Sequence, residues 1–265
     1  GSDDAESIKV HLAQKVNTLQ SFRSMFDKTK NTDPKKKEFY LGFEFKNVNV
    51  TQSLGQYVPL DMIKAKGGIL TGNLELSQKH KESVMKVKGK LNVKNGTLEY
   101  DDFDGNIENI DAVIDMQKDD ISVDAKTSIE SHPVTFKMNY SIPKHNIDMK
   151  LTTDNVPFKE IARYKLIKNS NVKANGNVSG ELNAKINVQN KEVALDGKFS
   201  SPQIAIANYR FRDLKTSLKM SREQILTLEN TSFHFDETIS GFKVKNDVAM
   251  PKFTYNVKEK HGNGN

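Results

Sequence analysis

Side chains capable of acid-base chemistry or metal binding are present in this chain, but their spacing suits neither role. The six histidines lack metal-ligand spacing such as His-Glu-x-x-His; they are His11, His80, His132, His145, His234 and His261. The run Asp101-Asp102-Phe103-Asp104-Gly105 is similar to the start of a calcium loop, yet it lacks the distal Glu that completes one. No phosphate-binding loop, nucleophile elbow or dinucleotide fingerprint occurs. We therefore expect no enzyme activity, no cofactor and no metal site.

Composition narrows the class of protein further. The 265 residues include no Cys, which excludes a disulfide framework, a thiolate metal site and a cysteine nucleophile. No run approaches the roughly 18 consecutive apolar residues of a membrane-spanning helix, and no signal peptide is present. Gly1-Ser2 is typical of a cloning remnant, so a signal or anchor could precede this sequence in the natural protein.

The net charge of +6 could suit an anionic partner, but the distribution of charge argues against nucleic acid. Apart from Lys35-Lys36-Lys37, the lysines stand singly among apolar residues. That pattern is typical of the solvated face of a sheet, so we expect no nucleic-acid partner.

Residues 3–30 show helical spacing. Apolar residues recur every three or four positions, at Ile8, Leu12, Val16, Leu19, Phe22 and Phe26. Carboxylates at the start and lysines at the end suit the helix dipole. The spacing predicts an amphipathic helix, followed by a linker over residues 31–38. The helix either packs on the edge of a sheet or plugs an apolar groove.

From Phe39 the apolar period changes to two and continues to Val257, which predicts strands with one apolar and one polar face. Such strands belong to antiparallel sheets. Lys94-Asn95-Gly96, Lys118-Asp119-Asp120 and Pro143-Lys144-His145-Asn146 are predicted to be hairpin connections. Residues 258–265 are expected to form a disordered tail.

An internal repeat divides the strand region into residues 39–154 and residues 155–257. Thr71-Gly72-Asn73-Leu74 matches Ser179-Gly180-Glu181-Leu182 at an offset of 108, and Gly89 matches Gly197 at the same offset. Later positions, such as Met116 and Met220, align at an offset of 104, which implies a four-residue deletion in the second copy. Val58-Pro59 and Val156-Pro157 are each predicted to begin a short helix across the end of the sheet.

These motifs resemble the repeating unit of the AsmA/TamB group of bacterial envelope proteins. A short helix after Val-Pro is followed by Gly68-Ile69-Leu70-Thr71-Gly72-Asn73-Leu74-Glu75-Leu76 and then by Gly89-Lys90-Leu91-Asn92-Val93-Lys94-Asn95-Gly96-Thr97-Leu98. The second copy departs from the pattern after Gly197. The resemblance implies an all-β fold with minor helices, in which an elongated antiparallel sheet of two repeats curls into a U-shaped trough.

The resemblance also implies a function and a location. It suggests a segment of a periplasmic bridge, anchored in the inner membrane, that holds phospholipid or other acyl lipid in an apolar groove on the way to the outer membrane. The inward-facing residues would contact the lipid; they are Val134, Phe136, Met138, Tyr140, Leu182, Ile186, Leu195, Phe233, Phe235, Phe242 and Val244.

Alternation alone leaves other interpretations open. The same residues could fill the closed core of a β-sandwich that acts as a scaffold or an adhesin-like interaction domain. A third possibility is a factor that assists outer-membrane protein assembly by pairing exposed strand edges with its clients.

Overall fold

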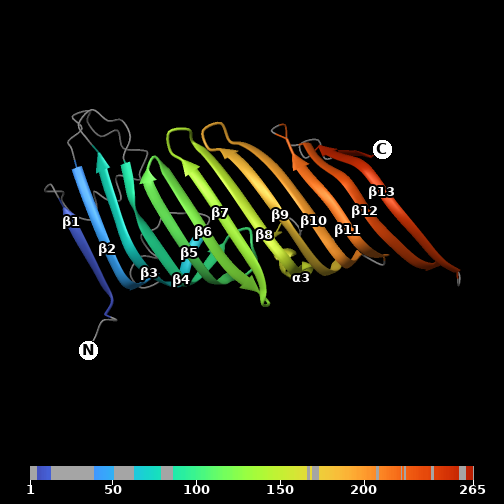
Figure 1. Ribbon diagram of the computed structural model, residues 1–265, viewed down its shortest axis with the longest axis horizontal. Coiled ribbons are helices and arrows are strands. Elements are labelled where there is room, and N and C mark those ends of the chain that lie inside the picture. Colours follow the sequence, from blue (N-terminus) through green and yellow to red (C-terminus); the bar gives the residue numbers. More distant parts are fainter. Residues whose placement is uncertain are drawn as a thin grey trace.

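The alternating sequence forms one antiparallel sheet in the computed structural model, which describes residues 5–12, 39–50, 63–78, 86–165, 168, 173–206, 209–221, 223, 225–239, 242–256 and 261–264. Over these residues each of fourteen strands pairs with the next along the chain. The longest axis of the molecule therefore runs across the strands, with the two termini at opposite ends (Figure 1).

The elements follow one another as hairpins. They are β1 Ser7–Leu12, β2 Phe39–Asn49, β3 Ile63–Gln78, β4 Lys86–Tyr100, β5 Asn106–Lys118, β6 Asp120–Ile129, β7 His132–Ser141, β8 Asn146–Pro157, α3 Phe158–Ile161, β9 Ala174–Asn187, β10 Glu192–Ile206, β11 Tyr209–Met220, β12 Ile225–Ile239, β13 Phe242–Asn256 and β14 His261–Gly264. The predicted all-β, antiparallel class is confirmed. Residues 261–264 form a strand, so the prediction of a disordered tail is wrong there.

The helix predicted for residues 3–30 is wrong where the structure describes that segment, because Ser7–Leu12 is a strand paired with β2. Ile8, Val10 and Leu12 alternate with polar residues, and this period of two outweighs the spacing of four between Ile8 and Leu12. The remainder of the predicted helix and the linker over residues 31–38 lie outside the described residues.

The predicted turns have two different outcomes. Lys118 and His145 adopt positive φ values of 55° and 53°, and both lie where a hairpin reverses, as expected. Lys94-Asn95-Gly96 instead lies inside the fifteen-residue strand β4. Asn95 has φ 51° there, and the pairing of β4 with β5 shifts between Val93 and Gly96. The Asn-Gly pair therefore forms a β-bulge rather than a hairpin turn.

The 108-residue repeat is reproduced in the pairing of β2–β4 and β8–β10. Val48 pairs with Leu70, and Val156 pairs with Val178. Just before each of these valines a bulge carries an asparagine with positive φ, Asn47 in β2 (50°) and its counterpart Asn155 in β8 (55°). The pairing thus places β2–β7 in the first copy and β8–β13 in the second. The boundary lies at the turn between β7 and β8, rather than between residues 154 and 155 inside β8.

A hydroxyl group caps the bulge in each copy. The Asn47 amide donates to the Thr71 hydroxyl at 3.4 Å, and the amide of Asn155 donates to the Ser179 hydroxyl at 2.7 Å. Because a bulge leaves an extra residue outside the ladder, this hydroxyl satisfies a donor that the sheet cannot.

Beyond β4 and β10 the two copies diverge. Gly89 pairs with Met116, whereas Gly197 pairs with Leu218 instead of Met220. In the observed pairing Met116 therefore corresponds to Leu218, two residues before the Met220 that the predicted offset of 104 gives. The five residues 101–105 connect β4 to β5, but only residues 207–208 connect β10 to β11. The second copy is thus shortened at this connection.

The helix predicted after Val156-Pro157 is present as α3, with Pro157 at its N-cap. By register Val48 corresponds to Val156, and Val50 corresponds to Phe158. Val50 has a helical conformation, as Phe158 does. The helix predicted from Val58 lies outside the described residues, except for Ile63, which begins β3.

Residues 159–165 and 168, called the strap below, begin in α3 and lead back to the connection between β4 and β5. The Asp104 amide donates to the Arg163 carbonyl, and the Lys165 amide donates to the Asp102 carbonyl. Lys159 forms an ion pair with Glu130 at the turn between β6 and β7. The strap therefore follows the strand ends from β8 to β4.

Candidate functional site

The apolar residues of successive strands join into rows that cross the sheet, because directly paired residues of neighbouring strands point to the same face. One row contains Phe45, Gly72, Leu91, Ile114, Val123, Met138, Met149, Ala184, Leu195, Met220, Leu226 and Tyr255. The adjacent row contains Val48, Leu70, Val93, Ala112, Ala125, Phe136, Leu151, Leu182, Gly197, Leu218, Leu228 and Phe253. These two central rows carry no charged residue from β2 to β13.

Seven of the eleven residues predicted to bind lipid come together on this face. Met138 and Leu195 lie in the first central row, and Phe136 and Leu182 lie in the second. The other three flank these rows and are Val134, Tyr140 and Ile186.

Phe233 and Phe235 lie near the other end of the same face, in a group of four rings. The Phe211 ring meets Phe233 edge-on at 5.0 Å between centroids and lies 5.8 Å from Phe235, and Tyr209 lies 5.9 Å from Phe235. Phe242 and Val244 pair in register with Ile239 and Glu237 of β12. The four rings are separate from the Phe136 region but belong to the same face, because the bulge at Asn230 reverses the alternation of β12 after Leu228.

The apolar face is half-buried over most of its area. Val134 is 8% exposed, but Phe136, Met138 and Leu182 are all of intermediate burial, and Leu151 is 37% exposed. Within the described residues one sheet is present, and no second sheet packs over these rows. A shallow hollow of about 600 Å³ is lined mostly by residues of the opposite, polar face, such as Asp124 and Lys137.

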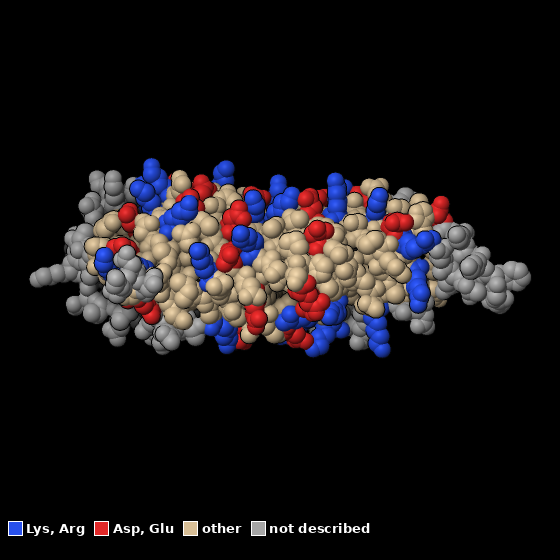
Figure 2. Space-filling model, turned by 60° about the horizontal axis from the view of Figure 1, so that its bottom comes forward, with Lys and Arg blue, Asp and Glu red and all other residues tan. Residues whose placement is uncertain are grey.

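The opposite face is polar and held by cross-strand ion pairs. Lys137 lies 3.3 Å from Asp124, and Lys150 lies 2.7 Å from Glu181. The hydrogen bond and charge of Lys150 lower the pKa of the Glu181 carboxyl. Figure 2 shows side chains of both signs interspersed along the molecule. This agrees with the scattered lysines of the sequence.

The strap closes one rim of the sheet beside the first copy. The Arg163 guanidinium lies 4.5 Å from the centroid of Phe103 and donates to the carbonyls of Asp104 and Asn106. The rings of Tyr100 and Tyr164 stack at 6.5 Å. Burial here, with Tyr164 and the nearby Asp102 carboxylate, raises the pKa of Tyr100 to about 12.

The run Asp101 to Gly105 thus holds the strap against the end of β4. Asp104 forms an ion pair with Lys168, and Asp102 accepts a hydrogen bond from the Tyr100 hydroxyl. Among the described residues, no three carboxylates or imidazoles gather as a metal site would require.

Several residues of the face were not in the predicted binding set. Ile114, Val123, Met149 and Ala184 share a row with Met138. These residues follow the same alternation of apolar and polar positions. Once the strand register is known, that alternation assigns them to the apolar face.

No helix within the described part of the chain is long and apolar enough to cross a membrane. No protein-family model, curated protein or solved structure matches the chain.

Proposed function

We propose that this chain is a non-catalytic, lipid-carrying segment whose apolar face holds the acyl chains of phospholipid or a similar lipid. The sheet curls lengthwise into a U-shaped trough with the central rows inside. A lipid moves along the rows, across the strands, without a covalent step.

The observation that carries the proposal is the continuity of the two central rows. An acyl chain lying across the strands meets Val, Leu, Ile, Met, Phe, Tyr, Ala or Gly at each step from β2 to β13. A sheet that needed this face only for an internal core would bury it under a second layer. Intermediate burial at Phe136, Met138 and Leu182 instead leaves area for a ligand.

The energetics favour such a track. Each methylene transferred from water gains about 0.8 kcal/mol, so exposing a chain of sixteen or so would cost roughly 12 kcal/mol. Fourteen strands at their usual spacing span roughly 60 Å, longer than a single acyl chain. A lipid can therefore shift from strand to strand without leaving an apolar surface.

The resemblance of the repeats to the AsmA/TamB group supports a location for this activity. By that analogy the segment belongs to a periplasmic bridge that is anchored in the inner membrane and reaches towards the outer membrane.

The test is to extract the purified protein with organic solvent and measure bound phospholipid by mass spectrometry, in the parent chain and in two variants. Phe136→Glu places a carboxylate in a central row. Thr135→Glu places the same carboxylate one residue away on the polar face, where the side chain is exposed. We expect stoichiometric lipid in the parent and in Thr135→Glu, and loss of lipid in Phe136→Glu.

Circular dichroism separates the outcomes. Loss of lipid from a Phe136→Glu protein with an intact β spectrum supports the trough. Absence of lipid from the parent chain, with unfolding of Phe136→Glu alone, would assign Phe136 to a closed core and favour the scaffold or adhesin-like function.

Assistance to outer-membrane protein assembly is a second candidate, favoured by the edge of the sheet at β13. Within the described residues, β14 pairs only with residues 253–256 of β13 and leaves residues 242–252 without a strand on that side. If this edge pairs with client strands, an unfolded outer-membrane protein should protect the β13 amides from hydrogen exchange. Unchanged exchange in β13 would exclude this candidate.

A further inference from the structure

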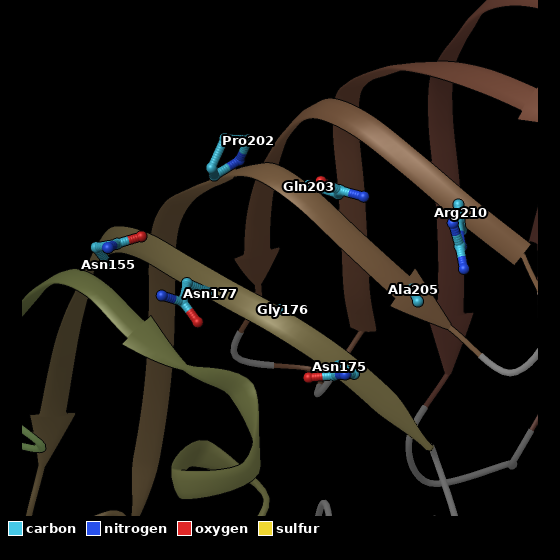
Figure 3. Close-up of a pocket in the computed structure, with 8 residues that line it drawn as sticks. All are labelled: Asn155, Asn175, Gly176, Asn177, Pro202, Gln203, Ala205 and Arg210. Carbon is cyan, nitrogen blue, oxygen red and sulfur yellow. The ribbon is translucent and has the colours of Figure 1, made fainter.

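A hollow of about 500 Å³ lies on the polar face over β8–β11 and brings together four amide side chains and one guanidinium. Figure 3 shows Asn155 on β8, Asn175 and Asn177 on β9, Gln203 on β10 and Arg210 on β11 around it. The β10 ribbon bends at Pro202 beside the hollow (Figure 3).

The register explains why these side chains converge. Asn175 pairs with Ala205, and Ala205 pairs with Arg210, so the three form one cross-strand row. Asn177 and Gln203 each lie two residues from a member of that row and share its face. Gly176 has φ 142°, and a Cβ there would lie 2.4 Å from the Gln203 carbonyl oxygen. The glycine thus allows β9 and β10 to approach closely beneath the hollow.

The chemistry of the lining is specific. An amide side chain both donates and accepts hydrogen bonds, as a sugar hydroxyl does. Among the described residues, no side-chain hydrogen bond occupies the amides of Asn155, Asn175, Asn177 or Gln203. Arg210 adds a permanent positive charge, and no carboxylate lines the hollow. The site therefore suits a ligand rich in hydroxyl groups that also carries negative charge.

The first copy indicates that the fold does not need the amides of Asn175 and Asn177. At the offset of 108, Asn175 corresponds to Gly67 and Asn177 to Ile69, and the pairing of Gly67 with Thr97 repeats that of Asn175 with Ala205. The two strands adopt the same register without the amides. The bulge asparagine is shared by both copies, so Asn175 and Asn177 are additions of the second copy.

We propose that this hollow is a binding site for a saccharide bearing an anionic group, either free or as the headgroup of a glycolipid. The amides bind the hydroxyls, and Arg210 binds the carboxylate or phosphate. The site is independent of the apolar face, because its side chains point to the other side of the sheet.

The test compares a tetragalacturonate oligosaccharide with neutral maltotetraose by NMR titration of the Asn and Gln side-chain amides. A swap variant, Asn175→Gly, Asn177→Ile and Gln203→Asn, replaces three of the lining residues by their counterparts in the first copy. We expect saturable binding of the anionic probe, weakened about tenfold or more in the swap variant because several hydrogen bonds are lost. Arg210→Gln should reduce anionic binding to the level of maltotetraose.

Flotation with phosphatidylcholine vesicles containing glucuronosyl diacylglycerol distinguishes a glycolipid headgroup from a free saccharide. Binding to either probe that is lost in the variants supports the proposal. Binding to neither probe, or binding that the swap variant and Arg210→Gln leave unchanged, overturns it. Arg210→Gln changes an exposed side chain and keeps the test decisive if the swap variant unfolds. Lipid extracted from the swap variant reports on the apolar face separately.

Discussion

The two copies of the repeat share their bulges but differ at one rim of the sheet. In the first copy, the connection between β4 and β5 is long and carries Phe103. Arg163 of the strap contacts the Phe103 ring and donates a hydrogen bond to the Asp104 carbonyl. In the second copy, the corresponding connection is short, and the rings of Tyr209, Phe211 and Phe235 lie beside it. Tyr209 is 50% exposed. One rim is covered by the chain itself, whereas the other presents aromatic surface.

This difference separates what the fold requires from what it permits. Features present in both copies, such as Val48 with Val156 and Asn47 with Asn155, set the strand register and curvature. Features found in one copy, such as the strap and the amide hollow, add a local role without changing that register. The following experiments test whether this division holds.

The largest effects are expected at the paired glycines of the two copies. A Cβ on Gly72 would lie 2.0 Å from the Lys90 carbonyl oxygen, and one on Gly180 would lie 2.4 Å from that of Lys198. Gly72→Ala and Gly180→Ala should each lower the free energy of unfolding by about 3 kcal/mol, because backbone must move. Urea denaturation measures this. Gly42→Ala is the control, since its nearest atom is the movable Tyr40 hydroxyl.

Equal losses would show that the two copies depend on the same backbone approach. A loss of stability only for Gly72→Ala would limit the effect to its positive φ of 137° and weaken the equivalence.

The fully buried valines test the equivalence through packing. Val48 is 0% exposed and Val156 is 1% exposed. Val48→Ala and Val156→Ala should each cost about 2 kcal/mol, from lost burial and the cavity left behind. Thermal unfolding followed by circular dichroism provides the measurement. Val188→Ala, at a side chain that is 47% exposed, should change little. A clear difference between the first two variants would contradict equal roles.

The strap tests the difference between the copies. Arg163→Gln removes the contact with Phe103 and the hydrogen bond to the Asp104 carbonyl, so we expect a loss of about 1 kcal/mol. Hydrogen exchange should accelerate at the amides of Asp104 and Lys165. Arg210→Gln in the second copy should leave unfolding unchanged. Slow exchange of the strap amides in Arg163→Gln would show that other contacts hold the strap.

Much of the fold follows from alternation, but register does not. The period of two predicts β7 from Val134 to Tyr140, and paired strands place Phe136 beside Leu151 as the pattern requires. The same pattern could not distinguish a bulge from a turn at Asn95-Gly96, because both conformations favour a positive φ. Single-sequence spacing also favoured a helix at Ile8, where pairing with β2 supplies the backbone hydrogen bonds of a strand.

The candidate sites were predictable to different degrees. The Phe136 region could be predicted because its inward residues all follow the apolar period of two. The amide hollow was missed, since Asn175 and Asn177 are typical of a loop when read singly. Only their comparison with Gly67 and Ile69 marks them as additions to the repeat.

The smallest effect is expected at an ion pair found in the second copy alone. Lys150 and Glu181 lie 2.7 Å apart, and the corresponding residues of the first copy are Gly42 and Asn73. The hydrogen bond from Lys150 lowers the pKa of Glu181 below its ordinary value of 4.5. Since the folded state has the lower pKa, the pair stabilises the fold above the unfolded pKa, and this contribution disappears as pH falls through the folded pKa.

Lys150→Met should therefore raise the pKa of Glu181 towards its ordinary value, as measured by carbon NMR titration of the carboxyl group. The variant should be less stable than the parent near neutral pH, and the free energies of unfolding of the two proteins should converge in acid. Because both side chains are well exposed, salt should reduce the difference. A Glu181 pKa unchanged by Lys150→Met would mean that Asn183 and Lys198 set it instead. The charge pattern of the second copy would then be a property of the whole face rather than of this pair.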